Sequence, residues 1–278
     1  MARQLTFAQQ VERSIIKTYR KEIWNPFVKA VKDYRLIAPE DKIAVCISGG
    51  KDSMLLAKCM QQLQRFSDFP FSLEFVCMDP GYHEVNRRQI ETNAEKLQVP
   101  IKFFETNIFD VTESVSGNPC YLCARMRRGH LYSIAKSLGC NKIALGHHLS
   151  DVIETTLLGM FYGAQLQAML PRLKSTNFEG MELIRPLYCV NEDAILKWKS
   201  YNGLAFIQCA CRFVDEYSHS EDGIGPSKRQ EIKALIKEMR KDNPDVERNI
   251  FMSIHNLKLD TFIGYKQDGT EHSFLEKF

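Results

Sequence analysis

Short apolar runs alternate with longer amphipathic segments between residues 42 and 209. The runs are rich in Ile, Val, Phe and Leu, as is typical of buried β-strands: KIAVCI, SLEFVCMD, IKFFET, NKIALGHH, MELIRPL and LAFIQC. The segments between them, such as EVNRRQIETNAEKL and EDAILKWKSYN, carry apolar residues at helical spacing. A strand–helix–strand repeat predicts right-handed crossovers, so we expect an α/β fold with a parallel sheet and helices on both faces.

Two flanking segments lie outside the alternating core. Residues 7 to 33 read as one amphipathic helix, and the residues after 212 lead through EYSHSEDGIGPSK to a charged helix around QEIKALIKEMRK. We therefore divide the chain into an added N-terminal helical extension (1–39), one α/β domain (40–212) and a C-terminal helical tail (213–278).

Composition and charge exclude several classes of protein. The chain has 44% hydrophobic and 26% charged residues, as folded proteins do, and its net charge of +3 is too small to indicate nucleic-acid binding by itself. No run approaches the ~18 apolar residues of a membrane span, and the N-terminus has no signal-peptide pattern. We expect no membrane association and a cytoplasmic location, where cysteines stay reduced.

The first apolar run leads directly into the turn SGGKDS, residues 48 to 53. A strand that ends in small residues and feeds a helix leaves backbone N–H groups pointing outward at the positive end of the helix dipole, which favours an anion. Gly49 and Gly50 permit close approach, Lys51 adds charge and Ser53 adds a hydroxyl. The spacing matches neither common nucleotide fingerprint. Phosphate is the expected ligand, against a plain tight turn as the alternative.

Four of the nine cysteines form two clusters, Cys120 with Cys123 in CYLCARMRRGH and Cys209 with Cys211 in FIQCACRF. A C-x-x-C pair can bind zinc, ligate an iron–sulfur cluster, act in redox chemistry or be buried, and spacing alone does not choose among these. A closed zinc site needs four ligands, whereas a cluster held by three leaves one iron open. The other five cysteines fall in or beside predicted strands and helices and are expected to be core residues.

A third group of polar residues follows another predicted strand, in GHHLSD from Gly146 to Asp151. Gly146 would let the backbone come near a nucleotide, and either histidine could contact phosphate or cap the next helix. Asp151 could interact with the helix N-terminus or serve as a magnesium and catalytic carboxylate. Arginines beside the C-x-x-C pair could form a solvated face or clamp phosphates: Arg125, Arg127 and Arg128.

The turn SGGKDS resembles the pyrophosphate-binding loop, or PP-loop, of the N-type ATP pyrophosphatases. Members of that superfamily have an adenine nucleotide alpha-hydrolase-like fold, split ATP between its α and β phosphates, and adenylate an oxygen of the substrate. The resemblance implies that Ser48, Gly49, Gly50, Lys51, Asp52 and Ser53 bind the pyrophosphate end of ATP. It also implies that Asp52 helps to hold Mg²⁺ or to position a reacting group.

The order of the motifs resembles the tRNA 2-thiocytidine synthetase family over about residues 40 to 212. The long windows CARMRRGHLY and KIALGHHLSDVIETTLLGMFYG carry the resemblance, with IRPL and the late cysteine pair after them. It implies an ATP-dependent tRNA sulfurtransferase in which ATP activates a cytidine C2 oxygen in the anticodon loop, and sulfur on a [4Fe–4S] cluster replaces that oxygen. The implied cluster ligands are Cys120, Cys123 and Cys211, with Cys209 as the alternative third ligand because the family's C-x-x-C is C-A-C here.

The same resemblance implies catalytic roles for Asp52, Asp151 and Arg127, and contact of Gly146 with ATP. Where the family has two adjacent aspartates, this chain has Ser150 and Asp151. The implied partners are tRNA, a sulfur donor such as a cysteine desulfurase or free sulfide, and a possible homodimer. Scattered basic residues could extend a surface for tRNA: Lys17, Arg20, Lys21, Arg87, Arg88, Arg172, Lys228 and Arg229.

Two alternative functions remain open from the residues. One is a PP-loop ligase that installs nitrogen or lysine and needs no cluster. The other is an RNA-binding protein stapled by zinc that kept the fold and lost catalysis, an alternative supported by Ser150 and the C-A-C spacing.

Overall fold

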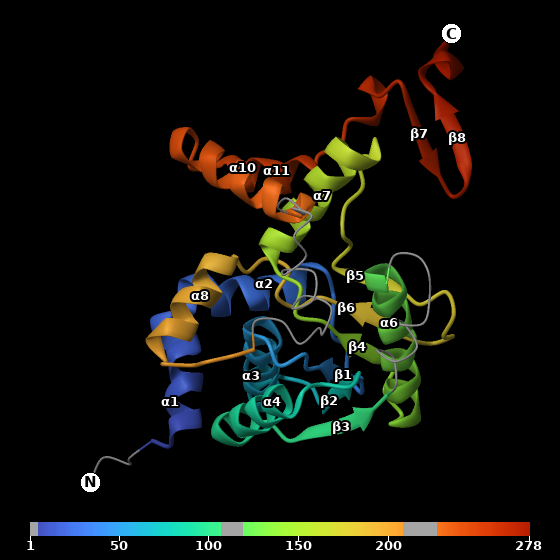
Figure 1. Cartoon of the computed structure of the whole chain (residues 1–278). Helices are drawn as coiled ribbons and strands as arrows, with labels where there is room; N and C mark the ends of the chain where they lie inside the picture. Colours follow the sequence, from blue (N-terminus) through green and yellow to red (C-terminus); the bar gives the residue numbers. More distant parts are fainter. Residues whose placement is uncertain (1–4, 107–118, 208–226) are drawn as a thin grey trace, which may run out of the picture. The chain divides into compact units, whose positions relative to one another are not determined.

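The computed structural model describes residues 5–106, 119–207 and 227–278, and of residues 119–125 the backbone alone (Figure 1). The chain divides into two compact units. The first comprises Met1–Val152 with Met169–Gly225, and the second comprises Ile153–Ala168 with Pro226–Phe278. The boundaries expected at residues 39/40 and 212/213 stay a prediction.

A six-stranded sheet forms the centre of the first unit. Its spatial order is β3 (Ile101–Glu105), β2 (Ser72–Asp79), β1 (Lys42–Cys46), β4 (Lys142–Ala144), β6 (Glu182–Ile184) and β5 (Arg172–Lys174). Neighbouring strands are parallel except for the antiparallel pair β5–β6. The chain builds outward from β1 to β3 on one side and resumes with β4 on the other. The switch point between β1 and β4 is where open α/β sheets leave a crevice.

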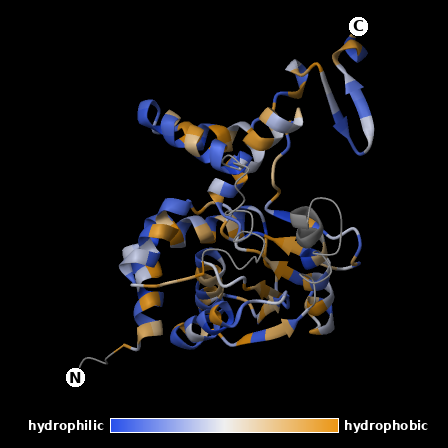
Figure 2. Ribbon diagram, viewed as in Figure 1, coloured by the Kyte–Doolittle hydropathy of each residue, from blue (hydrophilic) through white to orange (hydrophobic). Residues whose placement is uncertain are grey.

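Side chains of β1 alternate between two hydrophobic cores, one on each face of the sheet. Ile43 and Val45 belong to a core that includes residues of α3 (Lys51–Phe66), whereas Ala44 and Cys46 belong to a core that includes residues of α6 (Pro119–Ser137). This two-residue period is the geometry of a strand buried on both faces. In Figure 2 the sheet strands are largely hydrophobic. The predicted α/β class with helices on both faces is confirmed.

Three more helices were expected from their spacing and are present. They are α4 (Glu84–Leu97), α7 (Leu149–Gly163) and α8 (Glu192–Tyr201). Buried residues of α4 and α8, including Ile90 and Trp198, join the α3 side of the sheet. None of the helices in the described ranges is both long and apolar enough to cross a membrane.

The strand expected at LAFIQC is wrong for residues 204–207, which the structure describes outside the sheet. The carbonyl oxygen of Ala205 accepts hydrogen bonds from Asn93 Nδ2 at 2.9 Å and Gln89 Nε2 at 3.4 Å, so side chains of α4 take the place of a neighbouring strand. Strand β5 was not predicted, because its three residues, RLK, are too few and too polar to form an apolar run.

The predicted N-terminal helix is present with wide turns in its middle. It consists of α1 (Phe7–Arg13), two π-helical turns (Ser14–Thr18 and Arg20–Trp24) and α2 (Asn25–Asp33). Such turns insert extra residues into a helix. The buried residues Val11, Ile15, Ile23 and Phe27 still all join the α3 side of the core.

The second unit contains the C-terminal part of α7 together with α10 (Lys228–Asp242) and α11 (Val246–Ser253). A hairpin of β7 (Gly264–Gln267) and β8 (Thr270–Ser273) follows, with 3₁₀ turns at Leu259–Thr261 and Phe274–Lys277. The charged helix expected near residues 230–241 is confirmed as α10, and Ser227 caps it through a capping box with Gln230. The hairpin was not predicted.

Candidate functional site

A cavity of about 390 Å³ lies at the carboxyl ends of β1, β2 and β4. It is the crevice expected at the switch point of the sheet. The cavity is lined by the ends of these strands, by the SGGKDS turn of residues 48–53, which we call the glycine loop, by α6 and by the start of α7. The lining residues are Cys46, Ile47, Ser48, Asp52, Ser53, Met78, Arg127, Arg128, Leu131, Ile143, Leu145, Gly146, His147 and Asp151. Five of the residues predicted from sequence therefore line one cavity: Ser48, Asp52, Ser53, Gly146 and Asp151, with Arg127 as a sixth on the facing helix.

The glycine loop is braced from within by its two serines. Ser53 Oγ accepts hydrogen bonds from the Ser48 backbone N–H at 3.2 Å and the Ser48 hydroxyl at 3.3 Å, and donates to the Gly50 carbonyl at 3.0 Å. Gly49 has φ +83°, and a Cβ there would lie 2.5 Å from Ile90 Cγ1. Only glycine fits this position. Backbone N–H groups in the first turn of an α-helix have no carbonyl partner within it, so those at the start of α3, which begins at Lys51, can bind an anion.

Gly146 lies against the backbone of this loop. A Cβ at Gly146 would stand 3.1 Å from Ser53 N and 3.1 Å from the Asp52 carbonyl carbon. The turn after β4 and the start of α3 are thus in backbone contact, which explains why this strand must end in glycine. This contact supports the prediction that Gly146 belongs to the same site as the loop.

Lys51 is held by two carboxylates. Its Nζ lies 3.1 Å from Asp52 Oδ2 and 2.9 Å from Glu192 Oε1, and the side chains of Lys51 and Glu192 are 20% and 21% exposed. Burial lowers the pKa of Lys51, but the Coulombic attraction of Asp52 and the hydrogen bond to Glu192 outweigh it and raise the pKa above its usual value. The loop lysine is therefore charged at neutral pH.

Asp52 presents one carboxylate oxygen without a hydrogen-bond donor. Within the described part of the chain, Asp52 Oδ1 is buried and accepts no hydrogen bond, and His148 Nε2 lies 3.6 Å from it. A buried acceptor left unsatisfied is costly unless something binds it. A carboxylate oxygen in a cavity that also holds Asp151 is the hard oxygen ligand that Mg²⁺ prefers, so these residues fit a magnesium ion.

Asp151 and His148 form reciprocal hydrogen bonds at the start of α7. The His148 backbone N–H donates to Asp151 Oδ2 at 3.0 Å, and the Asp151 N–H donates to His148 Nδ1 at 3.4 Å. Asp151 thus takes the helix-terminal position foreseen as its structural role, while it also lines the cavity. The start of α7 and the cavity therefore share this carboxylate.

Arginines form a cationic side of the site. Arg127 and Arg128 line the cavity from α6. Arg185, directly after β6, is 8% exposed, and burial followed by the nearby charge of Arg128 lowers its pKa to about 10. Arg185 lies in the segment IRPL, and nothing in that segment's sequence predicted a role for it. Its burial beside the cavity residues could not be read from that motif.

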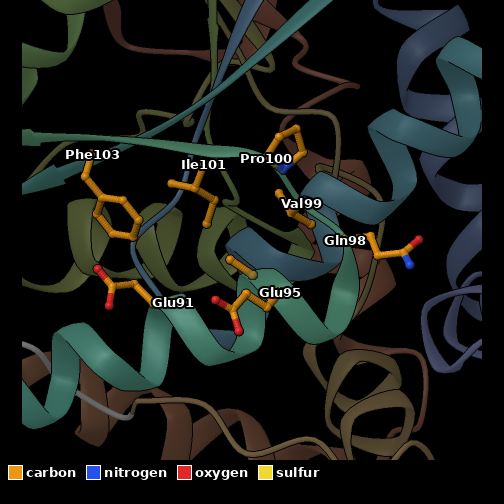
Figure 3. Close-up of a pocket in the computed structure, with 8 residues that line it drawn as sticks. Glu91, Glu95, Gln98, Val99, Pro100, Ile101 and Phe103 are labelled. Atoms are coloured by element: carbon orange, nitrogen blue, oxygen red, sulfur yellow. The ribbon is translucent and has the colours of Figure 1, made fainter.

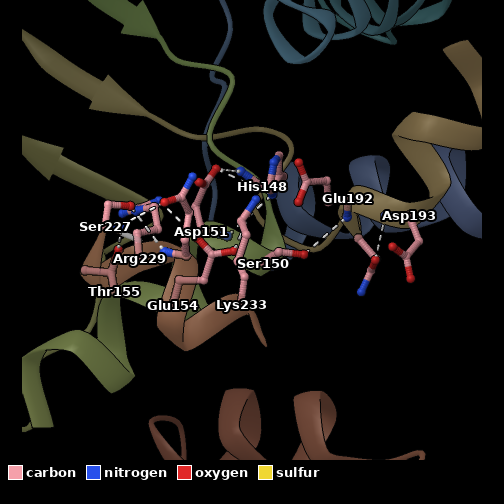
Figure 4. Close-up of polar contacts among 12 residues, drawn as sticks. His148, Ser150, Asp151, Glu154, Thr155, Glu192, Asp193, Ser227, Arg229 and Lys233 are labelled. Carbon is pink, nitrogen blue, oxygen red and sulfur yellow. Dashed lines mark hydrogen bonds and ion pairs between the residues drawn. The ribbon is translucent and has the colours of Figure 1, made fainter. Parts of the chain in front are cut away.

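Glu192 and Ser150 are site residues whose roles the sequence did not reveal. Ser150 Oγ accepts the backbone N–H of Glu192 at 3.3 Å, which joins the start of α7 to the start of α8 (Figure 4). The Leu149 N–H donates to the Val190 carbonyl at 2.9 Å in the same junction. Ser150, at the position where the resemblance implies an aspartate, therefore has a structural function here. An acidic residue at the start of a predicted helix was the only signal for Glu192.

The described cysteines are poor candidates for metal ligands. They are Cys46, Cys59, Cys77, Cys140 and Cys189, and burial raises the pKa of each. No three His, Cys, Asp or Glu side chains in the described ranges form a metal-binding group.

The cluster ligands predicted from sequence lie elsewhere. Cys120 and Cys123 lie three residues apart at the start of α6, and this spacing puts them on the same face of the helix. Their side chains, and the whole of Cys209 and Cys211, lie outside the described residues. Thiolates are the donors that iron–sulfur clusters use, so the residues available fit such a cluster in kind.

The basic track predicted for tRNA is largely paired. Arg87 contacts Asp79 at 2.7 Å, Arg172 contacts Glu182 at 2.7 Å, and ion pairs also hold three others of that set: Arg88, Lys228 and Arg229. In Figure 4, Arg229 of the second unit reaches Glu154, a residue that is 2% exposed. These residues are neutralised locally, so they give no concentrated positive surface by themselves.

A second hollow, of about 490 Å³, opens between α4 and the amino end of β3 (Figure 3). Its lining includes Glu91, Glu95, Ile101 and Phe103. No residue predicted for the site lies in it, and it is at the opposite end of β3 from the edge where the glycine loop lies. Ligand chemistry therefore concentrates in the cavity at the switch point.

Comparisons with known proteins agree with this geometry. A family model described as a PP-loop domain matches residues 11–218. A tRNA-cytidine(32) 2-sulfurtransferase of Geobacter sulfurreducens is 34% identical over 241 residues, covering 86% of this chain and 90% of the relative. One of Neisseria meningitidis serogroup C is 37% identical over 234 residues, covering 82% of this chain and 69% of the relative.

The fold also matches a solved structure. The U34-tRNA thiolase NcsA from Methanococcus maripaludis, solved with its [4Fe-4S] cluster, aligns with a TM-score of 0.64 at 20% identity, over 84% of this chain and 79% of that chain. At this identity the likeness concerns the fold. The sequence relatives and the family model together show that the chain belongs to the PP-loop proteins and, within them, to the tRNA-cytidine(32) 2-sulfurtransferases, a family of enzymes.

Proposed function

We propose that the chain is an ATP-dependent tRNA sulfurtransferase that adenylates the C2 oxygen of a cytidine in the anticodon loop and replaces it with sulfur. The relatives are named for cytidine 32, which supports that position. The observation that carries the proposal is the backbone contact of Gly146 with the SGGKDS loop at the switch-point cavity. It joins a phosphate cradle to a pocket large enough for a base.

The cavity suits the two ends of ATP differently. The loop from Ser48 to Ser53 offers N–H groups, hydroxyls and Lys51 to the phosphates. Cys46, Met78, Ile143 and Leu145 supply apolar surface on which a flat aromatic base can pack. We assign the phosphates to the loop and the adenine to that apolar wall.

Adenylation requires charge stabilisation at the α-phosphorus. The C2 oxygen of the cytidine attacks this phosphorus, the bond to the β-phosphate oxygen breaks, and pyrophosphate leaves. We assign to Arg127, which lines the cavity, the stabilisation of the charge that develops on the phosphate oxygens, because a guanidinium matches their geometry. Mg²⁺, held by Asp52 and Asp151, would neutralise phosphate charge during this step.

Sulfide (HS⁻) then adds at C2 and loses its proton, and the bond from C2 to the adenylated oxygen breaks with release of AMP, so carbon and sulfur keep their oxidation states. Sulfur that arrives as a persulfide must first be reduced by two electrons from a thiol or another reductant. A [4Fe–4S] cluster bound by Cys120, Cys123 and Cys211, with Cys209 as the alternative third ligand, would supply an open iron position for sulfur. Positioning of the activated base against the sulfur provides most of the rate enhancement in this scheme.

The proposed reaction takes place in the cytoplasm, with tRNA as substrate and a cysteine desulfurase or free sulfide as sulfur donor. We keep a homodimer as a proposal. Domain assignments follow the same scheme, with ATP and cluster binding in residues 40–212.

Anaerobic purification of the full chain tests the cluster and the reaction together. We expect broad absorption near 400 nm, the region of cysteine-ligated clusters, with about four iron atoms per chain. A Cys120→Ala, Cys123→Ala double variant should lose both, while Cys140→Ala, a buried cysteine, should keep both. Stoichiometric zinc without colour, or ATP-dependent tRNA modification by cluster-free protein, would refute the sulfur-transfer scheme.

A further inference from the structure

The ammonium group of Lys51 faces an excess of negative charge. Asp52 Oδ2 at 3.1 Å and Glu192 Oε1 at 2.9 Å give two carboxylates to one cation in a loop that we assign to phosphate binding. Asp52 is the next residue in the chain, whereas Glu192 comes from 141 residues away. The second carboxylate is thus brought to the loop by the fold.

Several contacts fix Glu192 at this position. It lies in the first turn of α8, where the helix dipole favours a carboxylate, and Asn191 caps that turn by accepting the Asp193 N–H at 2.8 Å. Ser150 Oγ holds the Glu192 backbone N–H (Figure 4). These contacts fix the backbone from which the Glu192 carboxylate reaches Lys51.

A negative charge beside the loop affects the two forms of ATP unequally. Free ATP carries close to four negative charges and its magnesium complex about two, and Coulombic repulsion grows with the charge of the ligand. A cation held by Asp52, whose Oδ1 lacks a hydrogen-bond partner among the described residues, would also remove the Asp52 charge from Lys51. Of its two carboxylate partners, Lys51 would then keep Glu192 while it also binds the phosphate.

We propose that Glu192 is a specificity residue that masks Lys51 and so makes the loop select magnesium-bound ATP over free ATP. The proposal rests on the assignment of ATP to this loop. Nothing in the reaction scheme above requires Glu192 to touch the substrate. Its effect is on which form of the nucleotide enters.

Equilibrium binding of α,β-methylene-ATP to the full-length protein tests the proposal without turnover. We would measure its Kd by calorimetry in excess Mg²⁺ and in EDTA, for wild type and for Glu192→Gln. The variant should bind the metal-free analogue about tenfold more tightly, an energy of about 1.4 kcal/mol. Its Kd in Mg²⁺ should change by no more than about threefold, so the preference for the magnesium form shrinks.

Two further variants separate masking from other effects. Asp193→Asn removes an exposed carboxylate from the same turn of α8 and should leave both Kd values within about twofold of wild type. In a Lys51→Met background, Glu192→Gln should no longer improve binding of the free analogue, because the ammonium group that Glu192 neutralises is absent.

An unchanged or weaker Kd for the free analogue in Glu192→Gln would overturn the proposal and show that Glu192 positions Lys51 for binding. A full gain that persists in the Lys51→Met background would also overturn it, in favour of direct repulsion. If wild type binds neither form of the analogue, the ATP assignment itself is wrong and the inference goes with it.

Discussion

Replacing Gly146 with alanine tests the central contact of the site. The new Cβ would lie 3.1 Å from both Ser53 N and the Asp52 carbonyl carbon, so the turn after β4 and the start of α3 must separate by a few tenths of an ångström. Both neighbours are backbone atoms that cannot rotate aside. Overpacking of this kind costs about 1–3 kcal/mol, and a change of that size lowers Tm by roughly 2 to 5 °C in a chain of this length.

The same displacement should weaken ATP binding. The N–H groups that would hold the phosphates belong to the residues that move, and a loss of about 1–2 kcal/mol raises Kd roughly 5- to 30-fold. Calorimetric titration of α,β-methylene-ATP, with thermal unfolding in parallel, measures both effects.

Gly129→Ala provides the matched control. Among the described residues, no atom lies within 4 Å of a Cβ at Gly129 on α6, so this variant should be more stable by about 0.5–1 kcal/mol, as expected for glycine to alanine in a helix, with unchanged ATP affinity. The reasoning fails if Gly146→Ala lowers Tm yet binds the analogue as wild type does, because the contact would then be structural and remote from the nucleotide.

Three further substitutions have defined outcomes. Asp52→Asn should reduce affinity for the magnesium-bound analogue at least tenfold, since it removes the carboxylate whose Oδ1 accepts no hydrogen bond from the described residues, while affinity for the free analogue should not fall, because Lys51 loses one of its two carboxylate partners; equal losses in titrations with Mg²⁺ and EDTA would contradict this. Glu12→Gln should destabilise the fold by about 3–5 kcal/mol at pH 7, because it leaves Lys58, 1% exposed, without its charge partner at 2.8 Å. Burial raises the pKa of Glu12, but hydrogen bonds from Arg65 and Lys58 outweigh it and hold the pKa below 4.5, so the stabilisation is complete above that pH and is lost as the pH falls through the lowered folded value. Urea unfolding from pH 7 to pH 3 should therefore show the two proteins converging, and a constant gap would argue against the ion pair. Ser150→Ala removes the acceptor that joins α7 to α8 and should cost about 1 kcal/mol in the same assay, whereas no loss would mean that water replaces the bond.

Local patterns were sufficient to predict most of the fold. The period of two in KIAVCI follows from burial on both faces of the sheet, and the helical spacing of EVNRRQIETNAEKL predicted the bounds of α4. LAFI has the composition of a strand, but its carbonyl at Ala205 is satisfied by side chains of α4. Only the tertiary partners distinguish these two outcomes, so the sequence could not.

The site divides in the same way. Residues that act through backbone shape, such as Gly49 and Gly146, stand out because their neighbours in sequence already define a strand end. Glu192 reaches Lys51 only after α8 folds against the loop, and its sequence context is that of any helix start. Ser150 departs from a pattern, but the Glu192 N–H that it accepts could not be inferred from the departure.

The five described cysteines have thiols that ionise poorly, which makes them unreactive toward the sulfur chemistry proposed for this protein. Burial raises the pKa of Cys46 and Cys77 to about 12 and those of Cys140 and Cys189 to about 11, and raises that of Cys59 as well. At neutral pH only about one such thiol in 10⁴ or fewer is ionised, and the thiolate is the form that attacks sulfur or binds metal. If the protein handles sulfide or persulfide as proposed, its four buried thiols, Cys46, Cys59, Cys77 and Cys140, will not form mixed disulfides readily, and a mild alkylating reagent should spare them in the folded protein longer than the half-buried Cys189.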